Sequence, residues 1–351
     1  MLARGFRICW FSSATDPVPR RDGAALELVA VKTSNIVERL TQLPYPLWTP
    51  AALPRLWREI GRAQIVHVHE HLYGSSIVAI LLAKLRRRPV VVTQHMGALG
   101  LGSRAFTAVY ECGARLLGTL LFPPVARTVF ISRNVLEFFG RERSPRAQLI
   151  FNGVDVHRFT PVADGERASI RAALGLPPGA PVVLFVGRFV RKKGLHRVLA
   201  LAQRFPHVQW VLVGSGPEQP QQPPANVHVA GRVEHDRLPQ YYRAADLLIL
   251  PSSGEGMPLV VQEALCCGAG ILSTDEVASA CPEAADLIRS HPVPRAGDDR
   301  PDGTRRCALR SRTAATGGAC RTRGAGACLV VPERCVAQYD DVFHQLVAEA
   351  S

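Results

Sequence analysis

Short apolar runs alternate with amphipathic stretches along almost the whole chain. The runs VVLFV and DLLIL are nearly continuous in apolar residues, which is typical of strands buried on both faces of a parallel sheet. Strands are predicted in the first half at residues 7–11, 25–31, 65–69, 90–93, 128–131 and 148–150, and in the second half at 182–186, 209–213, 227–229 and 246–250. Helices are predicted at 54–61, 75–87, 104–121, 134–139, 195–204, 238–243 and 258–267. This alternation predicts an α/β protein whose parallel sheets are covered by helices.

The chain is expected to divide near residues 152–155, where Asn-Gly signals a turn. Two Rossmann-like units would then enclose a cleft, with ligands at the carboxyl ends of their strands. The predicted divisions are residues 1–150, 151–290, an irregular arginine-rich segment at 291–332, and a closing amphipathic helix at 333–351.

Charge and composition narrow the class of partner. The 351 residues carry a formal net charge of +13 with 47% hydrophobic residues, which describes a globular protein whose partner is acidic. The nine cysteines include no C-x-x-C pair, which favours reduced thiols over a disulfide scaffold or structural zinc. No signal peptide and no membrane span is predicted, so a cytoplasmic protein is expected.

The strongest chemical signal is the octapeptide GRFVRKKG, which directly follows a predicted buried strand. Gly187 lets backbone approach a ligand closely, while Arg188 and Lys193 place two cations over the cleft. Fixed positive charge at this position suits a diphosphate leaving group. A solvated basic loop is an equally good interpretation of this octapeptide alone.

A second signal, EGMPLVVQE, follows the predicted strand at 246–250. Glu255 lies in a glycine-flanked loop, and Glu263 lies within the next helix among apolar neighbours. Carboxylates at these two places can accept hydrogen bonds from sugar hydroxyls, and the amino end of the helix can receive a phosphate. The alternative is that both are ordinary surface glutamates.

Taken together, these segments resemble the GT-B glycosyltransferases of family 4, a group of retaining enzymes. GRFVRKKG is similar to their donor-phosphate motif, EGMPLVVQEALCCG to their E-x7-E motif, and IFNGVDVHRFTP to their interdomain linker. The resemblance implies that Arg188 and Lys193 bind the donor diphosphate, that Glu263 binds the ribose, and that Glu255 contacts the transferred sugar. The donor-binding set implied in this way is Gly187, Arg188, Lys193, Arg232, Val233, Gly256, Met257, Pro258, Leu259 and Glu263.

In the first half, VVVTQHMG places His95 where the family has a histidine that contacts the donor sugar. His95 and Glu255 are therefore the expected catalytic pair. His67, His69 and His71 alternate and are expected to share one strand face, but no carboxylate or cysteine cluster supports a metal site there. The chain also has no D-x-D pair, so metal-independent chemistry without a cofactor is expected, with a UDP- or GDP-sugar as the donor substrate.

The resemblance fails in two regions. Residues 1–6 are similar to the end of the family's first helix, so the first strand and its glycine-rich loop are expected to be missing. Residues 303–332 match no family pattern, which suggests either a shifted reading frame or a low-complexity insertion. Gly270 also stands where the family usually has proline.

The resulting prediction is a retaining hexosyltransferase that acts on a glycan or lipid-linked acceptor, with a role in polysaccharide biosynthesis. The basic helices around 84–88 and 104–127 could hold it peripherally at the inner face of a membrane. The alternatives are an inactive remnant that binds nucleotide only, a sugar-nucleotide epimerase, and a nucleic-acid-binding protein suggested by charge alone. No nucleic-acid motif supports the last, so nucleic acid is not an expected partner.

Overall fold

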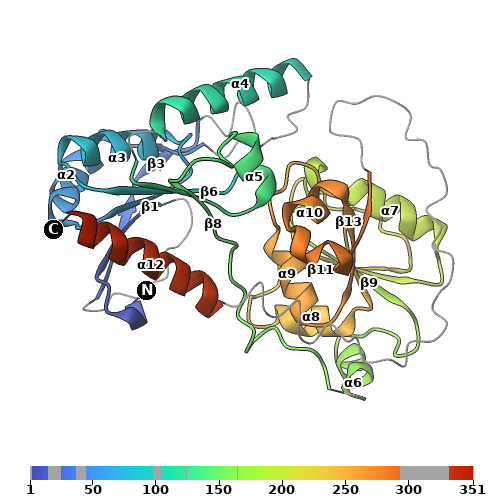
Figure 1. Ribbon diagram of the computed structural model, residues 1–351. Coiled ribbons are helices and arrows are strands. Elements are labelled where there is room, and N and C mark those ends of the chain that lie inside the picture. The colour runs from blue at the N-terminus through green and yellow to red at the C-terminus, as the bar shows by residue number, and fades with distance from the viewer. Residues whose placement is uncertain are drawn as a thin grey trace.

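The computed structural model describes residues 2–14, 25–36, 45–97, 104–122, 125–163, 165–292 and 332–350. Two α/β halves lie side by side, each built on parallel strands with helices packed on the faces (Figure 1). The predicted α/β class is therefore confirmed. The irregular segment expected at 291–332 falls almost entirely outside the described residues.

The first half contains short strands alternating with helices, as the pattern predicts. Its elements are η1 (Leu2–Arg4), β1 (Ile8–Ser13), β2 (Leu26–Val31), β3 (Thr33–Ser34), β4 (Leu47–Trp48), η2 (Pro50–Ala52), α2 (Leu53–Arg62), β5 (Val66–His69), α3 (Gly74–Leu85), β6 (Val90–Gln94), α4 (Arg104–Leu121), β7 (Arg127–Phe130), α5 (Arg133–Phe138) and β8 (Ala147–Leu149). Most of these bounds differ from the predicted ones by one or two residues.

The parallel strands of this half form two separate sheets. One has the order β5-β6-β7-β8, and the other is the parallel pair β1-β2. A further short antiparallel pair, β3-β4, was not predicted because two-residue strands have no measurable period. Among the described residues, β1 and β5 therefore each have one edge without a strand neighbour.

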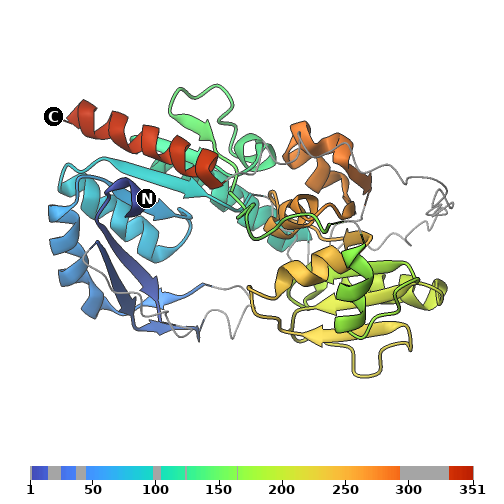
Figure 2. The same cartoon turned by 90° about the horizontal axis from the view of Figure 1, so that it is seen from below.

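The last helix, α12 (Pro332–Ala350), packs against the first half although it lies at the other end of the sequence. Val342, Phe343 and Leu346 pack on Val91 and Val129 of the sheet. The opposite face is covered by α2, α3 and α4, whose buried residues include Leu56, Ile60, Ile80 and Ala114. Figure 2 shows α12 lying along the first half, although it follows the second half in sequence.

The second half holds the larger hydrophobic core. Its elements are α6 (Glu166–Ala173), β9 (Val182–Val186), η3 (Arg191–Lys193), α7 (Leu195–Arg204), β10 (Gln209–Val213), β11 (Val227–Gly231), α8 (Leu238–Ala244), β12 (Leu247–Leu250), α9 (Leu259–Cys266), β13 (Gly270–Thr274), α10 (Asp275–Ala280), η4 (Pro282–Leu287) and β14 (Ile288–His291). All residues of β9 are buried, as its apolar run predicts.

The strand order of this sheet is β11-β10-β9-β12-β13-β14, with every pair parallel. The chain builds outward from β9 to β11, then returns to the other side of β9 with β12. The order thus reverses between β9 and β12, and the loops after these two strands meet at a switch point where open α/β sheets bind ligands. GRFVRKKG follows β9, and PSSGEG follows β12.

Helix α6 was not predicted, because its sequence reads as part of a polar linker. Its Arg171 is buried and donates to the carbonyl oxygens of Ala244, Pro178 and Ala180. The same guanidinium pairs with Asp246 at 2.8 Å, and that carboxylate also accepts the Val182 amide. These contacts attach α6 to the start of β9 and β12, so the helix depends on tertiary partners that local periodicity does not reveal.

Gly214, after β10, is expected to tolerate no side chain. Its φ is +141°, and a Cβ there would lie 1.9 Å from the carbonyl oxygen of Gly187. Gly214→Ala should therefore lower the free energy of unfolding by more than about 2 kcal/mol. Gly179→Ala is the matched control, since a Cβ at Gly179 meets nothing within 4 Å. Urea unfolding that shows equal stability for both variants would contradict this account.

Candidate functional site

A cleft of about 2350 Å³ is lined by residues from both halves. From the second half it is lined by Gly187, Arg188, Arg232 and Val233, together with residues 213–216. These residues lie at the carboxyl ends of β9, β10 and β11. From the first half, its wall includes residues of β1, β2, β4, β5, α2, α3 and α12. Four of the predicted donor-binding residues therefore line one cleft.

The loop after β9 brings three cations close together. Gly187 has the left-handed φ of +156°, and its position would place a Cβ 3.8 Å from Cδ of Lys193. Burial, together with the neighbouring charges of Lys193 and Arg188, lowers the pKa of Lys192, although Glu255 acts against this. The loop thus concentrates positive charge, and an anion bound there would reduce the repulsion between these cations.

Lys193 is paired with Glu255, the residue expected to contact the sugar. Nζ of Lys193 lies 2.8 Å from Oε1 of Glu255, and the two side chains are only 18% and 14% exposed. The Ser253 amide donates to the carbonyl oxygen of Lys192 at 2.9 Å, which joins the two loops by their backbones. The loops after β9 and β12, which are distant in sequence, therefore form one charged unit.

Glu263 lies apart from that unit, inside α9. It is 7% exposed, and its Oε2 accepts the hydroxyl of Tyr242 at 2.6 Å. Burial raises the pKa of Glu263, while the hydrogen bond from Tyr242 works in the opposite direction. Tyr242 is itself fully buried in α8, so it fixes the orientation of this carboxylate. Sequence reasoning missed Tyr242, because the pair spans two helices.

The remaining donor-binding candidates surround the start of α9. Met257 and Pro258 are buried, and Pro258 occupies the N-cap position. Leu259, the first helical residue, is 44% exposed. The amino end of α9 therefore follows directly on the Glu255 loop.

His95, which belongs to the first half, lies beside the Glu255 loop of the second half. A Cβ on Gly256 would lie 3.4 Å from the His95 carbonyl oxygen, so the Glu255 loop lies against the residue expected to be its catalytic partner. Nε2 of His95 is 2.9 Å from Nδ1 of His69, so one of these nitrogens donates and the other accepts. Burial and the neighbouring His69 lower the pKa of His95 to about 4. Its imidazole is thus neutral near pH 7.

Glu70 supports the turn that carries His95, and sequence reasoning did not identify it. Its backbone has φ of +63°, a conformation that non-glycine residues rarely adopt, and the residue is 5% exposed. Oε1 accepts the amides of His95 at 2.6 Å and Met96 at 2.7 Å, and Oε2 accepts Nε2 of Gln94 at 2.5 Å. Three N–H donors converge on one carboxylate, an arrangement that favours its ionised form.

Gln94 extends this network to His71. Because its Nε2 donates to Glu70 and to the Met96 carbonyl, its Oε1 accepts Nδ1 of His71 at 2.6 Å. His71 is fully buried against Phe122 and Phe139. The prediction that His71 shares a strand face with His67 and His69 is therefore wrong. Strand β5 ends at His69, and the left-handed turn at Glu70 sends His71 into the core.

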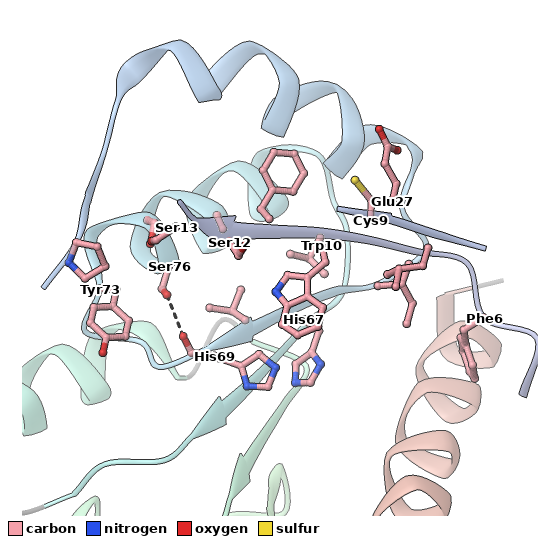
Figure 3. A pocket seen from close by; sticks show the side chains of 18 of the residues that line it. Phe6, Cys9, Trp10, Ser12, Ser13, Glu27, His67, His69, Tyr73 and Ser76 are labelled. Carbon is pink, nitrogen blue, oxygen red and sulfur yellow. Dashed lines mark hydrogen bonds between the residues drawn. The ribbon is translucent and has the colours of Figure 1, made fainter. Parts of the chain in front are cut away.

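His67 and His69 do share a face, with ring centroids 4.5 Å apart, and both point into the cleft (Figure 3). Burial and the neighbouring imidazoles lower the pKa of His67 to about 3. Elsewhere in the described residues, Cys9, Glu27 and Glu59 bring potential metal-ligand atoms within 4.8 Å of one another. Glu27 is paired with Arg55 and Glu59 with Arg62, so arginines already neutralise these carboxylates.

Glu70→Gln should loosen the His95 turn while preserving its shape. The substituted amide would turn a donor toward the donor Nε2 of Gln94, and its remaining oxygen would be a weaker acceptor. Amide hydrogen exchange at His95 and Met96 should be about tenfold faster, whereas exposed Glu142→Gln should leave it unchanged. Burial raises the pKa of Glu70 to about 7, so protection of these amides in the wild type should fall as pH drops through about 7. If the amides of His95 and Met96 are equally protected in both variants, and if this protection does not depend on pH, then the Glu70 carboxylate does not hold the His95 turn.

Two family descriptions cover most of the chain. Residues 1–158 match "Glycosyltransferase Family 4", and residues 166–286 match "Glycosyl transferases group 1". The D-inositol 3-phosphate glycosyltransferase of Rhodococcus jostii is 30% identical over 305 residues, which cover 78% of this chain and 67% of that protein. The protein of the same name from Nocardia farcinica is 34% identical over 233 residues, covering 59% of this chain and 51% of the relative. The chain thus spans between half and two thirds of these relatives.

Solved structures agree on the fold. The HepE protein of Anabaena, solved with UDP and glucose, has a TM-score of 0.69 at 16% identity, with 97% of this chain and 99% of that chain covered. The sucrose-phosphate synthase of Thermosynechococcus elongatus has a TM-score of 0.67 at 19% identity, with 100% and 91% covered. Because the family descriptions, the relatives and the fold all agree, the chain belongs to the family 4 glycosyltransferases and has their GT-B fold.

Proposed function

We propose that this protein transfers a hexosyl unit from a UDP- or GDP-sugar with retention of anomeric configuration. The observation that carries the proposal is the Lys193–Glu255 ion pair, which lies at the switch point of the second sheet and against the His95 turn. Cation, carboxylate and neutral imidazole are the groups that a diphosphate and an adjoining sugar require.

The leaving group in this reaction is a nucleoside diphosphate. Arg188 and Lys193 would neutralise the charge that builds on its oxygens as the glycosidic bond breaks. The amino end of α9 would add backbone N–H groups. Side chains thus supply the positive charge, and we propose a reaction that is independent of metal.

The ion pair also favours a nucleotide sugar over a bare nucleotide. A diphosphate that takes Lys193 leaves Glu255 with no counter-charge in a largely buried position, and an unpaired buried carboxylate is costly. Sugar hydroxyls can donate to that carboxylate, and His95 can donate to or accept from another. Donor sugar and donor phosphate would therefore bind cooperatively.

We propose a glycan or lipid-linked acceptor. The relatives' name specifies a phosphorylated inositol for those proteins, and the basic cleft of this chain suits an acidic acceptor of related chemistry. Arg7 and Arg62 line the acceptor side of the cleft, and Arg188 lines the donor side.

A peripheral membrane contact is part of the same proposal. Every described helix is too short or too polar to span a bilayer. The outer surfaces of α3 and α4 nevertheless carry apolar side chains that are 50–72% exposed, namely Leu81, Leu85, Val109, Leu116 and Leu120. Lys84 and Arg87 are exposed beside them, which suits an anionic lipid surface.

UDP or GDP should raise the melting temperature of the full chain, and Lys193→Ala should remove the shift. Loss of a charge-assisted phosphate contact is worth about 1.5–3 kcal/mol, or roughly 10- to 100-fold in Kd. Glu255→Gln should increase the melting-temperature shift that free nucleotide causes, because it removes the carboxylate that competes with the nucleotide for Lys193. The same variant should nevertheless lower the rate of sugar transfer. Thermal unfolding and a donor-turnover assay measure the two effects separately.

The exposed Lys84→Ala variant is the matched control for Lys193→Ala, since it removes a lysine on α3 that is not part of the Lys193–Glu255 ion pair. If neither nucleotide shifts the wild-type melting curve, the donor site is not competent. Nucleotide binding without turnover of any donor would identify a chain that only binds nucleotide.

Leu116→Gln combined with Leu120→Gln should weaken binding to vesicles that contain phosphatidylglycerol by about tenfold or more, because the apolar contact is lost. Leu53→Gln is the matched control, since Leu53 is 42% exposed but lies on α2. Co-sedimentation with these vesicles and with purely zwitterionic ones measures the effect. Equal binding by both variants would exclude the α3–α4 surface.

A further inference from the structure

The face of the first sheet that lies toward α12 carries a row of imidazole side chains. Strand pairing places His69 of β5 opposite Thr93 of β6, and the Thr93 hydroxyl contacts that of Tyr339 on α12, which identifies the face. Side chains alternate between the two faces along a strand, so the next residue of β6 to emerge on this face is two positions further on. That residue is His95, which therefore comes out beside His69.

The row is anchored at one end by α12. Nε2 of His67 lies 2.8 Å from Oγ1 of Thr93, and that hydroxyl lies 2.8 Å from the hydroxyl of Tyr339. The His67 ring also contacts the rings of Tyr339 and Phe343, with centroids 5.4 Å and 5.5 Å away. His69 lies against His67, with ring centroids 4.5 Å apart (Figure 3). The His69 ring is thus supported, through His67, by a helix from the other end of the sequence.

His69 in turn holds the ring of His95. The two rings are stacked, with centroids 5.2 Å apart and an interplanar angle of 23°. Nδ1 of His69 lies 2.9 Å from Nε2 of His95. The Glu70 carboxylate fixes the backbone of the His95 turn, but a contact to the backbone leaves both side-chain torsions of a histidine free. The contact between the two imidazoles therefore supplies the constraint on the ring that Glu70 does not.

The same hydrogen bond couples the proton positions of the two rings. Burial lowers the pKa of both imidazoles, so each ring carries a single proton near neutral pH. If Nδ1 of His69 is protonated, it donates to Nε2 of His95, and the proton of His95 must then lie on its Nδ1. If Nε2 of His95 donates instead, the proton of His69 must lie on its Nε2. In either arrangement the two rings carry their protons on the same-named atom.

The coupling decides what His95 can offer to a ligand. Its other ring nitrogen, Nδ1, has no hydrogen-bond partner among the described residues. In the first arrangement Nδ1 is a donor, which suits a phosphate oxygen or a hydroxyl, and in the second it is an acceptor, which suits only a hydroxyl. The proton on His69 therefore sets the hydrogen-bonding character of the nitrogen that His95 leaves for a substrate.

We propose that His69 is a positioning residue for His95, which fixes both the orientation and the tautomer of the imidazole expected to contact the donor sugar. The inference rests on the proposed function, because His69 acts through the expected catalytic residue and does not itself contact the donor. Packing alone does not explain the arrangement. An apolar side chain of similar size would support the His95 ring but could not bind its Nε2.

Nitrogen NMR of the full chain with isotope-labelled histidines tests the coupling without any substrate, because protonated and bare ring nitrogens resonate far apart. Near neutral pH, His69 and His95 should show the same tautomer, either both on Nδ1 or both on Nε2. His69→Leu should shift the ring-nitrogen signals of His95. His69→Asn, whose amide can hydrogen-bond from the position of Nδ1, should leave these signals close to those of the wild type. Different tautomers in the two wild-type rings would overturn the proposal.

Donor turnover tests the positioning role. His69→Leu should lower kcat about five- to tenfold, the equivalent of one neutral hydrogen bond. It should leave the Kd of UDP unchanged, because the proposed phosphate contacts come from Arg188 and Lys193 in the second half. His69→Asn is nearly the same size as the leucine variant and should recover most of the rate. His207→Leu is the matched control, since His207 is exposed and precedes β10 at the edge of the sheet opposite the cleft.

Melting temperatures show whether a lost rate comes from unfolding. If His69→Leu does not fold, His69→Gln is a second variant, because it keeps a polar amide but places it beyond the position of Nδ1, so its rate should also fall. An active wild type whose rate is unchanged in His69→Leu, or not recovered in a stable His69→Asn, would show that His69 does not position His95. A wild type that turns over no donor contradicts the proposed function instead. The coupling is then decided by NMR, where matching tautomers support it and different ones overturn it.

Discussion

The pairing of β9 with β12 is the constraint on which the candidate site depends. Val183 and Leu184 lie in register with Leu247 and Leu248, although β10 and β11 separate the two strands in sequence. Parallel pairing brings both carboxyl ends to one edge, so the cationic loop and the acidic loop must meet. The buried apolar residues of these two strands thus determine the position of charges that are themselves not part of the core.

Those charges are arranged so that they neutralise each other within the protein. Lys193 and Glu255 form an ion pair at 2.8 Å in a largely buried setting. Such a pair gains little net stability, because desolvation opposes its Coulombic attraction, but removal of one partner leaves a costly unpaired charge. Under the proposed function, a ligand that replaces only one partner would therefore be disfavoured. A ligand with an anionic group and a neutral hydroxylated group side by side would be favoured.

The sequence predicts the local parts of this picture and misses the long-range ones. The helix at 104–121 and the strand at 182–186 have the predicted bounds, because each has an uninterrupted period or apolar run. The two donor loops could be found because glycine, cations and carboxylates cluster directly after predicted strands. Helix α6 could not, because its stability rests on contacts of Arg171 with residues up to about 75 positions away, beyond the reach of any local period.

Several residues of the candidate site could not be predicted either, because their partners are also distant in sequence. Glu70, Gln94 and Tyr242 act through partners on other elements, and nothing in their immediate sequence marks them. Alternation correctly predicts that His67 and His69 share a face, but it fails at His71, because one residue with positive φ reverses the direction of the chain. A glutamate carries no sequence signal for that conformation, which glycine or asparagine would have suggested.

Each half fixes its part of the candidate site by a different device. In the second half, adjacent buried strands and the Ser253–Lys192 backbone hydrogen bond hold the two charged loops together. In the first half, His95 follows β6, an inner strand of its sheet, and the Glu70 carboxylate accepts the amides of His95 and Met96. The cationic loop, the acidic loop and the His95 turn are therefore each fixed by their own half before any ligand binds, which is the preorganisation that a transfer reaction between two bound substrates would require.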